Sequence, residues 1–304
     1  MFINKIFYKL TNRKKYNELK GEQGNKERKA WYETSFRKKI SDIQNKIQNN
    51  NNLNFLHSGH LGDIIDSLAL IKELSKSHKC NLFIESNKKV GKSQHNHPAG
   101  QYYLNENMIN KILPLLKSQS FLNEVNYYKN EKIDINLNFF REIYTKMNMA
   151  STRWYFHISG VHTDLSNPYL DVDPHKNIGN NKVVLIRSSR RKNILVNYSF
   201  LKKYDNLLFI GLHQEYEDLK KQIPNLEFHD CSDFLEMAQI IKGSKFFLGN
   251  ITFGYCIAEA LKVPRLLECS HDGDLAAVHP SGKNSYEFFF QDHFEKWFDY
   301  LYKL

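Results

Sequence analysis

Cysteine and long apolar runs are both scarce in this sequence of 304 residues. The four cysteines are scattered and form no C-x-x-C pair; they are Cys80, Cys231, Cys256 and Cys269. This pattern predicts reduced thiols and argues against a zinc cluster. The apolar runs are too short for a membrane-spanning helix, and the first residues are too charged for a secretory signal. We therefore expect a cytoplasmic protein.

Two nucleotide-binding signatures are also missing. The chain contains neither G-x-G-x-x-G nor a Walker A motif. These motifs place glycines and a lysine around a bound pyrophosphate or triphosphate. A dinucleotide-binding or P-loop function therefore has no support in the sequence.

The net charge of +10 is concentrated near the N-terminus. Residues 1–50 hold thirteen Lys or Arg and five Asp or Glu, a net +8, which leaves +2 for the other 254 residues. Apolar residues at helical spacing are interleaved with Lys5 and Lys9; they are Phe2, Ile3, Ile6, Phe7 and Leu10.

Such a short basic amphipathic helix either lies on an anionic membrane surface or packs on the body of the protein, and we favour the body. A membrane contact would use residues 1–20 and would hold the protein at the inner face of the membrane. The aromatic residues do not alternate with the basic ones as a base-stacking platform requires, so we expect no nucleic-acid binding.

A strand, a turn with two glycines and a helix follow the extension. Leu53–His57 is a candidate buried strand, Ser58–Asp63 is the turn, and Cys80–Glu85 is the next strand. The helix between the strands has one apolar face, formed by Leu61, Ile64, Ile65, Leu68, Ile71 and Leu74. This order is typical of the βαβ unit of a parallel sheet. The less regular stretch after it contains a helical pattern near Met108–Leu116 and a possible strand at Ile133–Leu137.

Short apolar runs recur about every twenty residues in the last third of the chain. They begin at Val183, Leu207, Leu226, Phe246 and Arg265. Helical patterns lie between them at 215–222, 233–241 and 253–261. Strands that alternate with helices at this spacing predict a second doubly wound α/β domain.

We therefore predict an α/β protein with two Rossmann-like doubly wound domains that face each other across a cleft. The expected parts are a basic helical extension at 1–50, an N-terminal α/β domain at 51–180, a C-terminal Rossmann-like domain at 181–285 and a last helix at 286–304. We expect this last helix to cross back to the first domain, because its apolar face needs a surface to cover. Ligands of such sheets bind beyond the carboxyl ends of the strands.

Each domain offers one candidate site at a strand end. In the first, Gly59 and Gly62 permit close backbone approach, and Asp63 is either a helix-capping residue or a functional carboxylate. In the second, the run from Arg187 to Lys192 contains four cations and two hydroxyls, which suits a diphosphate or a solvated basic loop. Further along, Thr252 either caps a helix or, with the amides that follow it, binds a phosphate oxygen.

The segment Leu61-Gly-Asp-Ile-Ile-Asp-Ser-Leu68 resembles the opening motif of the heptosyltransferase group of GT-B glycosyltransferases. The segment from Phe247 to Pro264 is similar to the strand–turn–helix donor segment of that family, and its F-G-x-x-x-x-E-A pattern resembles the donor helix of other GT-B enzymes. This chain departs from the family pattern at two positions. Ala69 stands where the family often has proline, and Cys256 stands where the family has histidine. Members of the group move heptose from a nucleotide diphosphate sugar to lipopolysaccharide.

The resemblance implies a glycosyltransferase with a nucleotide-sugar donor and a glycan, lipid-linked or lipopolysaccharide-type acceptor. Asp63 would be the general base, and His60 would assist or orient it. One base opposite the leaving group implies inversion at the anomeric carbon. The predicted donor-binding residues are Gly62, Arg187, Ser188, Arg190, Lys192, Gly211, Asn250, Thr252, Phe253, Gly254 and Glu259. The candidate acceptor residues are Arg141, Arg153 and Trp154.

We expect neither a metal nor another cofactor, because the cations and the helix N-terminus would neutralise the leaving diphosphate. The triplets Asp171–Asp173 and Asp272–Asp274 match the D-x-D pattern that binds a divalent metal in GT-A enzymes. The first leads into Pro174 in a loop, and the second lies too near the C-terminus for that fold. Two other functions remain open: a nucleotide-sugar epimerase or hydrolase of the same fold, and a module that binds a nucleotide sugar without turnover.

Overall fold

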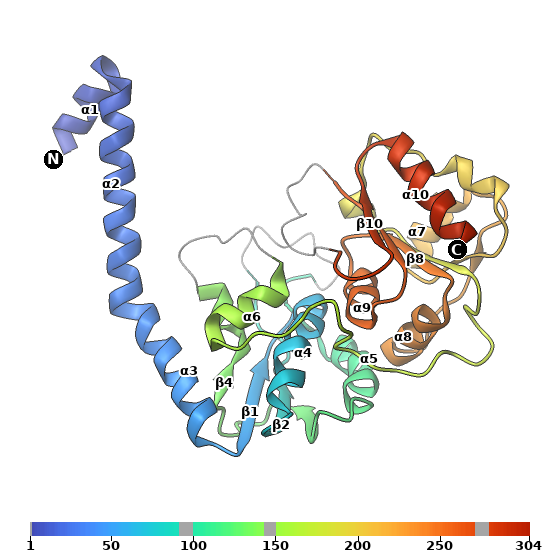
Figure 1. Cartoon of the computed structure of the whole chain (residues 1–304), viewed down its shortest axis with the longest axis horizontal. Helices are drawn as coiled ribbons and strands as arrows, with labels where there is room; N and C mark the ends of the chain where they lie inside the picture. The colour runs from blue at the N-terminus through green and yellow to red at the C-terminus, as the bar shows by residue number, and fades with distance from the viewer. Residues whose placement is uncertain (1, 91–99, 143–149, 271–279) are drawn as a thin grey trace.

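The computed structural model describes residues 2–90, 100–142, 150–270 and 280–304. These residues form two parallel β-sheets with helices around them, and a long helical arm at the N-terminus (Figure 1). The fold class predicted from the sequence is therefore confirmed. Among the described residues, no helix has the length and apolar character needed to cross a bilayer.

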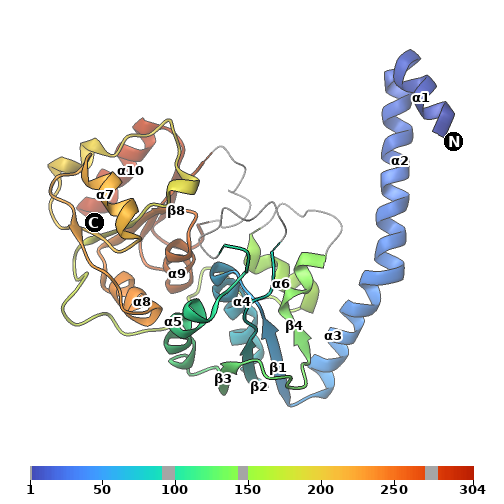
Figure 2. The same ribbon diagram turned by 180° about the vertical axis from the view of Figure 1, so that it is seen from behind.

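The N-terminal arm consists of consecutive helical segments. They are α1 (Phe2–Thr11), α2 (Arg13–Trp31), a π-helical turn (Tyr32–Phe36) and α3 (Arg37–Asn49). The helix α3 and the π-helical turn contact the body, where Ile43 is buried and the Phe36 ring lies 5.0 Å from that of Phe139. None of the side chains of α2 is buried. The arm projects from the body with α1 at its far end, so the expectation that the first helix packs on the body is wrong (Figure 1 and Figure 2).

The first sheet has the strand order β3-β2-β1-β4, and all its pairs are parallel. Its strands are β1 (Asn52–His57), β2 (Lys79–Ile84), β3 (Glu124–Tyr127) and β4 (Ile135–Asn136). Its helices are α4 (Leu61–Leu74), α5 (Glu106–Lys117) and α6 (Ser151–Ser159). The expected strands near 53, 80 and 133 are present, whereas β3 escaped prediction.

The second sheet is also fully parallel, with the order β10-β9-β8-β5-β6-β7. Its strands are β5 (Val183–Ile186), β6 (Leu207–Phe209), β7 (Glu227–Phe228), β8 (Phe246–Asn250), β9 (Arg265–Glu268) and β10 (Ser285–Phe288). Its helices are α7 (His213–Lys220), α8 (Phe234–Gly243), α9 (Phe253–Leu261) and α10 (Gln291–Lys303). Every apolar run expected to be a strand in this third of the chain is one.

The last helix does not cross back to the first domain as expected. Phe294 and Phe298 of α10 are buried in an apolar cluster made of residues of the second half, together with Phe246 and Phe288. The ring of Phe294 stacks on that of Phe288 at 4.0 Å, and β10 adds an edge strand to the second sheet. The apolar face of α10 is therefore satisfied by its own domain.

The two halves meet through helices, not through the sheets. One continuous apolar core contains Ile64 and Leu68 of α4 together with Ile257 and Ala260 of α9. The helix α5 packs against α8 in the same way. This contact fixes the carboxyl ends of the two sheets relative to each other and so builds the site described below.

Candidate functional site

Asp63 lies in the first turn of α4, directly after the loop that follows β1. One of its carboxylate oxygens, Oδ2, accepts a hydrogen bond from the His60 backbone amide at 3.0 Å and forms an ion pair with Arg141. The first contact is that of a helix-capping residue, as the sequence allowed. The side chain nevertheless keeps 22% of its surface exposed, so a reacting hydroxyl can reach the carboxylate.

Arg141 comes to Asp63 from the 3-10 helix after β4, Leu137–Glu142. Its guanidinium also donates to the carbonyl of Gly59 and, at 2.9 Å, to the Asn138 side chain. The guanidinium carbon lies 4.5 Å from the ring centroid of Tyr103. Cation–π contact and several hydrogen bonds hold the group in one place. A residue predicted to contact the acceptor thus lies next to the predicted base.

Burial alone would raise the pKa of Asp63, but the positive charge of Arg141, with smaller contributions from His57 and His60, lowers it below its ordinary value. The carboxylate is therefore ionised at neutral pH and able to accept a proton. The ring of His60, which begins α4, contacts the ring of Tyr103 edge to face, with centroids 5.0 Å apart. His60 thus contributes its backbone amide to the orientation of Asp63.

A buried histidine and a buried tyrosine support this loop, and no sequence pattern indicates either role. The Gly59 amide donates to Nδ1 of His57 at 2.9 Å, and the Tyr155 hydroxyl donates to the Asp63 carbonyl at 3.0 Å. The remaining 2.9 Å contact must then run from the Nε2 proton of His57 to the Tyr155 oxygen. Burial, aided by Arg141, lowers the pKa of His57 to about 3, which agrees with a neutral ring.

In the second half, the predicted donor segments converge at the carboxyl ends of β5 and β8. Asn250 accepts a hydrogen bond from the Ser188 amide at 2.9 Å and donates to the Ser188 carbonyl at 2.8 Å. A Cβ at Gly254 would lie 2.3 Å from the Ile186 side chain, so α9 starts close against β5. Thr252 caps α9 by accepting from the Tyr255 amide at 3.4 Å. Asn250, at the end of β8, therefore links this strand to the loop after β5. Its side-chain amide group is already hydrogen-bonded to the backbone of Ser188.

The N-terminal turns of α4 and α9 touch each other. A Cβ at Gly62 would lie 3.0 Å from the sulfur of Cys256. Glycine at position 62 thus permits the close approach of the two helices. Asp63 is the next residue of α4, and its negative charge, after burial and the charge of Asp66, contributes to the raised pKa of the Cys256 thiol in the first turn of α9. At this end of α9 the amides lack helical partners and the dipole is positive. The structure therefore places Gly62 and Asp63, at the start of α4, close to the start of α9, which Thr252 caps and where Gly254 follows.

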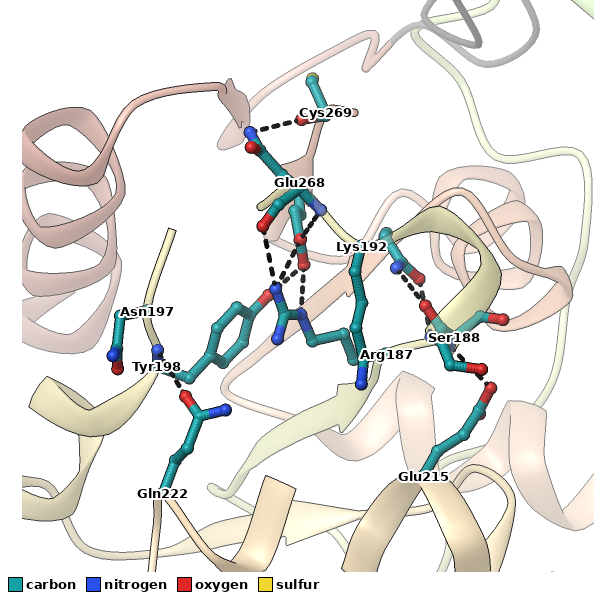
Figure 3. Close-up of polar contacts among 12 residues, drawn as sticks. Arg187, Ser188, Lys192, Asn197, Tyr198, Glu215, Gln222, Glu268 and Cys269 are labelled. Atoms are coloured by element: carbon teal, nitrogen blue, oxygen red, sulfur yellow. Dashed lines mark hydrogen bonds and ion pairs between the residues drawn. The ribbon is translucent and has the colours of Figure 1, made fainter. Parts of the chain in front are cut away.

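The Arg187 side chain points to Glu268 and Tyr198 (Figure 3). This position corrects the prediction that Arg187 binds a phosphate. Its guanidinium donates two hydrogen bonds to the Glu268 carboxylate, at 2.7 and 2.8 Å, and lies 4.1 Å from the ring centroid of Tyr198. Glu268 also accepts from the Tyr198 hydroxyl at 2.7 Å and from the Asn193 amide at 2.6 Å. Both charged groups are buried. Arg187 therefore holds the loop after β5 in place and is unavailable to a diphosphate.

The other cations of the loop have different positions. The side chain of Arg190 is exposed, and Lys192 lies 3.8 Å from Asp218 of α7. A small hollow lies between the loop and α7, and Lys192 is part of its lining. Its lining includes Glu215 and Asp218, whose negative charge makes it unsuitable for a diphosphate. Of the three predicted cations Arg187, Arg190 and Lys192, Arg190 is the exposed one.

The prediction that Glu259 binds the donor is also corrected. Glu259 lies near the C-terminal end of α9, away from the helix start, and is buried. Its carboxylate accepts from Arg265 at 2.6 Å and from the Ser281 hydroxyl at 2.6 Å, and it pairs with Lys262. All these partners hold α9 to the segments around it, so the expected contact with ribose hydroxyls is wrong.

The remaining predicted residues are spread over both halves. Arg153 is exposed on α6, and the ring of the half-buried Trp154 lies 6.3 Å from that of Phe140. Phe253 packs on Phe234 at 4.6 Å, and a Cβ at Gly211 would lie 2.8 Å from the ring of Phe209. These contacts explain Phe253 and Gly211 by packing. The triplet Asp272–Asp274 lies outside the described residues.

Two buried hydroxyls at strand ends have no hydrogen-bond partner in the described part of the chain. They belong to Ser58, directly after β1, and Ser270, just after β9. Buried polar atoms are normally paired, so an unpaired one indicates strain, a catalytic role, or a water or ion that completes its hydrogen bonds. Within the four described ranges, no three His, Cys, Asp or Glu side chains are grouped as a metal site.

Comparison with known proteins finds similarity at the level of structure only. No protein-family model and no curated protein sequence matches the chain. The solved structure of Escherichia coli heptosyltransferase WaaC with ADP is similar with a TM-score of 0.50 and 12% identity, over 82% of this chain and 99% of WaaC. E. coli ADP-heptose lipopolysaccharide heptosyltransferase II gives 0.49 and 10%, over 83% and 98% of the two chains. A family 9 glycosyl transferase of Veillonella parvula gives 0.48 and 10%, over 72% and 80%. The likeness to WaaC shows that this chain has the GT-B fold of a heptosyltransferase.

Proposed function

We propose that this protein is a glycosyltransferase that moves a sugar from a nucleoside diphosphate sugar to a hydroxyl group of a glycan or lipid-linked acceptor. The observation that carries the proposal is the contact between α4 and α9 at Gly62 and Cys256. The proposal is supported by the ionised, partly exposed carboxylate of Asp63, which follows Gly62 in α4, and by the positive end of α9, the helix that follows β8. A base and an anion site side by side are what glycosyl transfer requires.

In the proposed reaction, Asp63 accepts the proton of the acceptor hydroxyl while the new glycosidic bond forms. The carboxylate is oriented by the His60 amide and by Arg141. The bond from the anomeric carbon to the diphosphate breaks on the opposite side, so the configuration inverts. Because the pKa of Asp63 is lowered, the group is a weak base, and its contribution comes mainly from its fixed position.

The departing diphosphate gains negative charge as the bond breaks. We propose that the free amides at the start of α9, around Phe253 and Gly254, and the exposed Arg190 stabilise this charge. These groups would act without a metal ion, so turnover should persist in the presence of a chelator. WaaC was solved with ADP, which makes ADP the first nucleoside diphosphate to test.

The decisive variant is Asp63→Asn, with Asp205→Asn, an exposed aspartate of the second half, as the matched control. We expect Asp63→Asn to reduce turnover by about 10²–10⁴-fold, because a general base contributes on that order. ADP affinity by calorimetry should stay within about two-fold, because the anion site is on the other domain. A urea unfolding curve for each variant separates loss of function from loss of fold.

The product distinguishes the competing functions. Transfer is supported if the sugar appears on an added acceptor together with free nucleoside diphosphate. An epimerised donor, or free sugar released to water in the presence of acceptors, would contradict transfer. Donor binding without turnover on any acceptor would identify a binding module instead.

A further inference from the structure

The tip of the N-terminal arm carries an exposed apolar surface far from the body of the protein. We define the tip as α1 and the first residues of α2, up to Lys15. Ile6, Phe7 and Leu10 of α1 are exposed by 49%, 59% and 82%. Three large apolar side chains within two helical turns are an unusual load for a surface that nothing covers. The helix α1 packs along α2, at the end of the arm that lies away from the body (Figure 1).

Positive charge surrounds these apolar side chains. The exposed cations Lys9, Arg13, Lys14 and Lys15 follow within a few residues. The first twenty residues contain six Lys or Arg and a single acid, Glu18. A helix with bulky apolar side chains and a dense set of cations matches the interface of an anionic lipid bilayer, where acyl chains take the apolar groups and phosphates take the cations.

We propose that the tip of the arm binds the surface of an anionic lipid membrane. A nucleic acid would use the cations but would leave the aliphatic side chains of Ile6 and Leu10 in water. A second copy of the chain would need an apolar seam along α2, because long helices pair through apolar residues at heptad spacing. Among the side chains of α2 none is buried, and Leu19 is its single leucine. The positive charge and the cluster of exposed apolar side chains on α1 both favour the membrane.

The geometry of the arm indicates how a membrane-bound tip would orient the rest of the protein. Residues 13–49 form a nearly continuous helix, a rod of roughly 55 Å at 1.5 Å per residue. The chain descends this rod, reverses after α3 and returns along β1, so the tip lies toward the side on which β1 ends (Figure 1 and Figure 2). A bound tip would therefore hold the loop with Asp63 toward the bilayer at a spacing set by the rod. The membrane contact itself does not depend on the proposed glycosyl transfer.

The test is flotation of the full chain with lipid vesicles, without donor or acceptor. Vesicles of phosphatidylcholine alone are compared with vesicles that also contain phosphatidylglycerol, at low and high salt. The variant is Phe7→Ser with Leu10→Ser. The matched control is Ile194→Ser with Leu304→Ser, which removes two equally exposed apolar side chains from the other end of the molecule.

We expect the wild type and the control to bind anionic vesicles and to bind neutral ones at least about ten-fold more weakly, with high salt reducing the anionic binding. The tip variant should bind anionic vesicles at least about ten-fold more weakly than the control does. Far-UV circular dichroism confirms that each protein is folded. The proposal fails if the wild type does not bind, if the tip variant binds like the control, or if the tip variant instead dissociates a dimer of the free protein.

Discussion

The buried pair of Arg187 and Glu268 decides whether the basic loop after β5 serves folding or binding. Arg187→Met removes two charge-assisted hydrogen bonds to Glu268. The fully buried Glu268 carboxylate then lacks the positive charge that Arg187 supplies. Loss of one partner of a buried ion pair costs about 3–5 kcal/mol of stability. We expect this loss for Arg187→Met and, with the guanidinium left unpaired, for Glu268→Leu.

The double variant removes both charges at once. It leaves the Asn193 amide and the Tyr198 hydroxyl without their acceptor, at about 1–3 kcal/mol for each buried group. We therefore expect a total loss of about 2–6 kcal/mol, below the sum of about 6–10 kcal/mol for the two single variants. The midpoints of these ranges differ by a coupling free energy of about 4 kcal/mol, slightly above the usual range of about 0.5–3 kcal/mol for residues in contact.

Urea unfolding followed by circular dichroism measures these free energies, and calorimetry with ADP measures binding. Arg190→Met is the control, since an exposed substitution changes stability by no more than about 0.5 kcal/mol, and it should weaken ADP binding. The reasoning is refuted if Arg187→Met keeps the stability of the wild type and loses ADP affinity. That result would return Arg187 to the phosphate-binding role suggested by the sequence.

Three further predictions concern the site and its support. Arg141→Gln removes the positive charge that lowers the pKa of Asp63, so the pKa of Asp63 should rise. The acid limb of a plot of kcat/KM against pH should then move to higher pH, and an unmoved limb would exclude Asp63 as the titrating base. Glu259→Gln leaves buried cations without their countercharge and should lower the free energy of unfolding by about 3 kcal/mol, whereas a specific loss of ADP affinity would restore its ribose-binding role. Gly62→Ala brings a methyl group to 3.0 Å from the Cys256 sulfur, and turnover should fall and recover when Cys256→Ala is added; recovery in the double variant is the outcome that supports the close contact.

The sequence predicted most of the fold because buried parallel strands are apolar throughout. Val183–Ile186 and Phe246–Asn250 are fully buried, and such runs are visible without any knowledge of their neighbours. The missed strands β3 and β10 both lie at sheet edges, where half-exposed positions carry polar residues such as Asn126 and Glu287. Nothing in their local sequence separates them from loops.

The candidate site was predictable to the extent that it depends on short segments. Asp63 and Thr252 are helix-start residues next to glycines, and the structure keeps them there. Arg187 and Glu259 were predicted as ligand-binding groups because a lone charge in a sequence carries no sign of its partner. Glu268, which pairs with Arg187, is 81 residues away in the chain. Likewise, the support that Tyr155 gives to the Asp63 loop crosses 92 residues.

The apolar core shared by α4 and α9 makes the two halves one cooperative unit. Leu68 of α4 and Ile257 of α9 are buried in the same apolar core. Either half expressed alone would therefore expose an apolar surface and tend to aggregate. Heating should then give a single calorimetric peak for the body. For the same reason, a substitution on either side of this seam should alter the thermal stability of the whole protein, and an exchange of one half for that of another protein would have to match both faces.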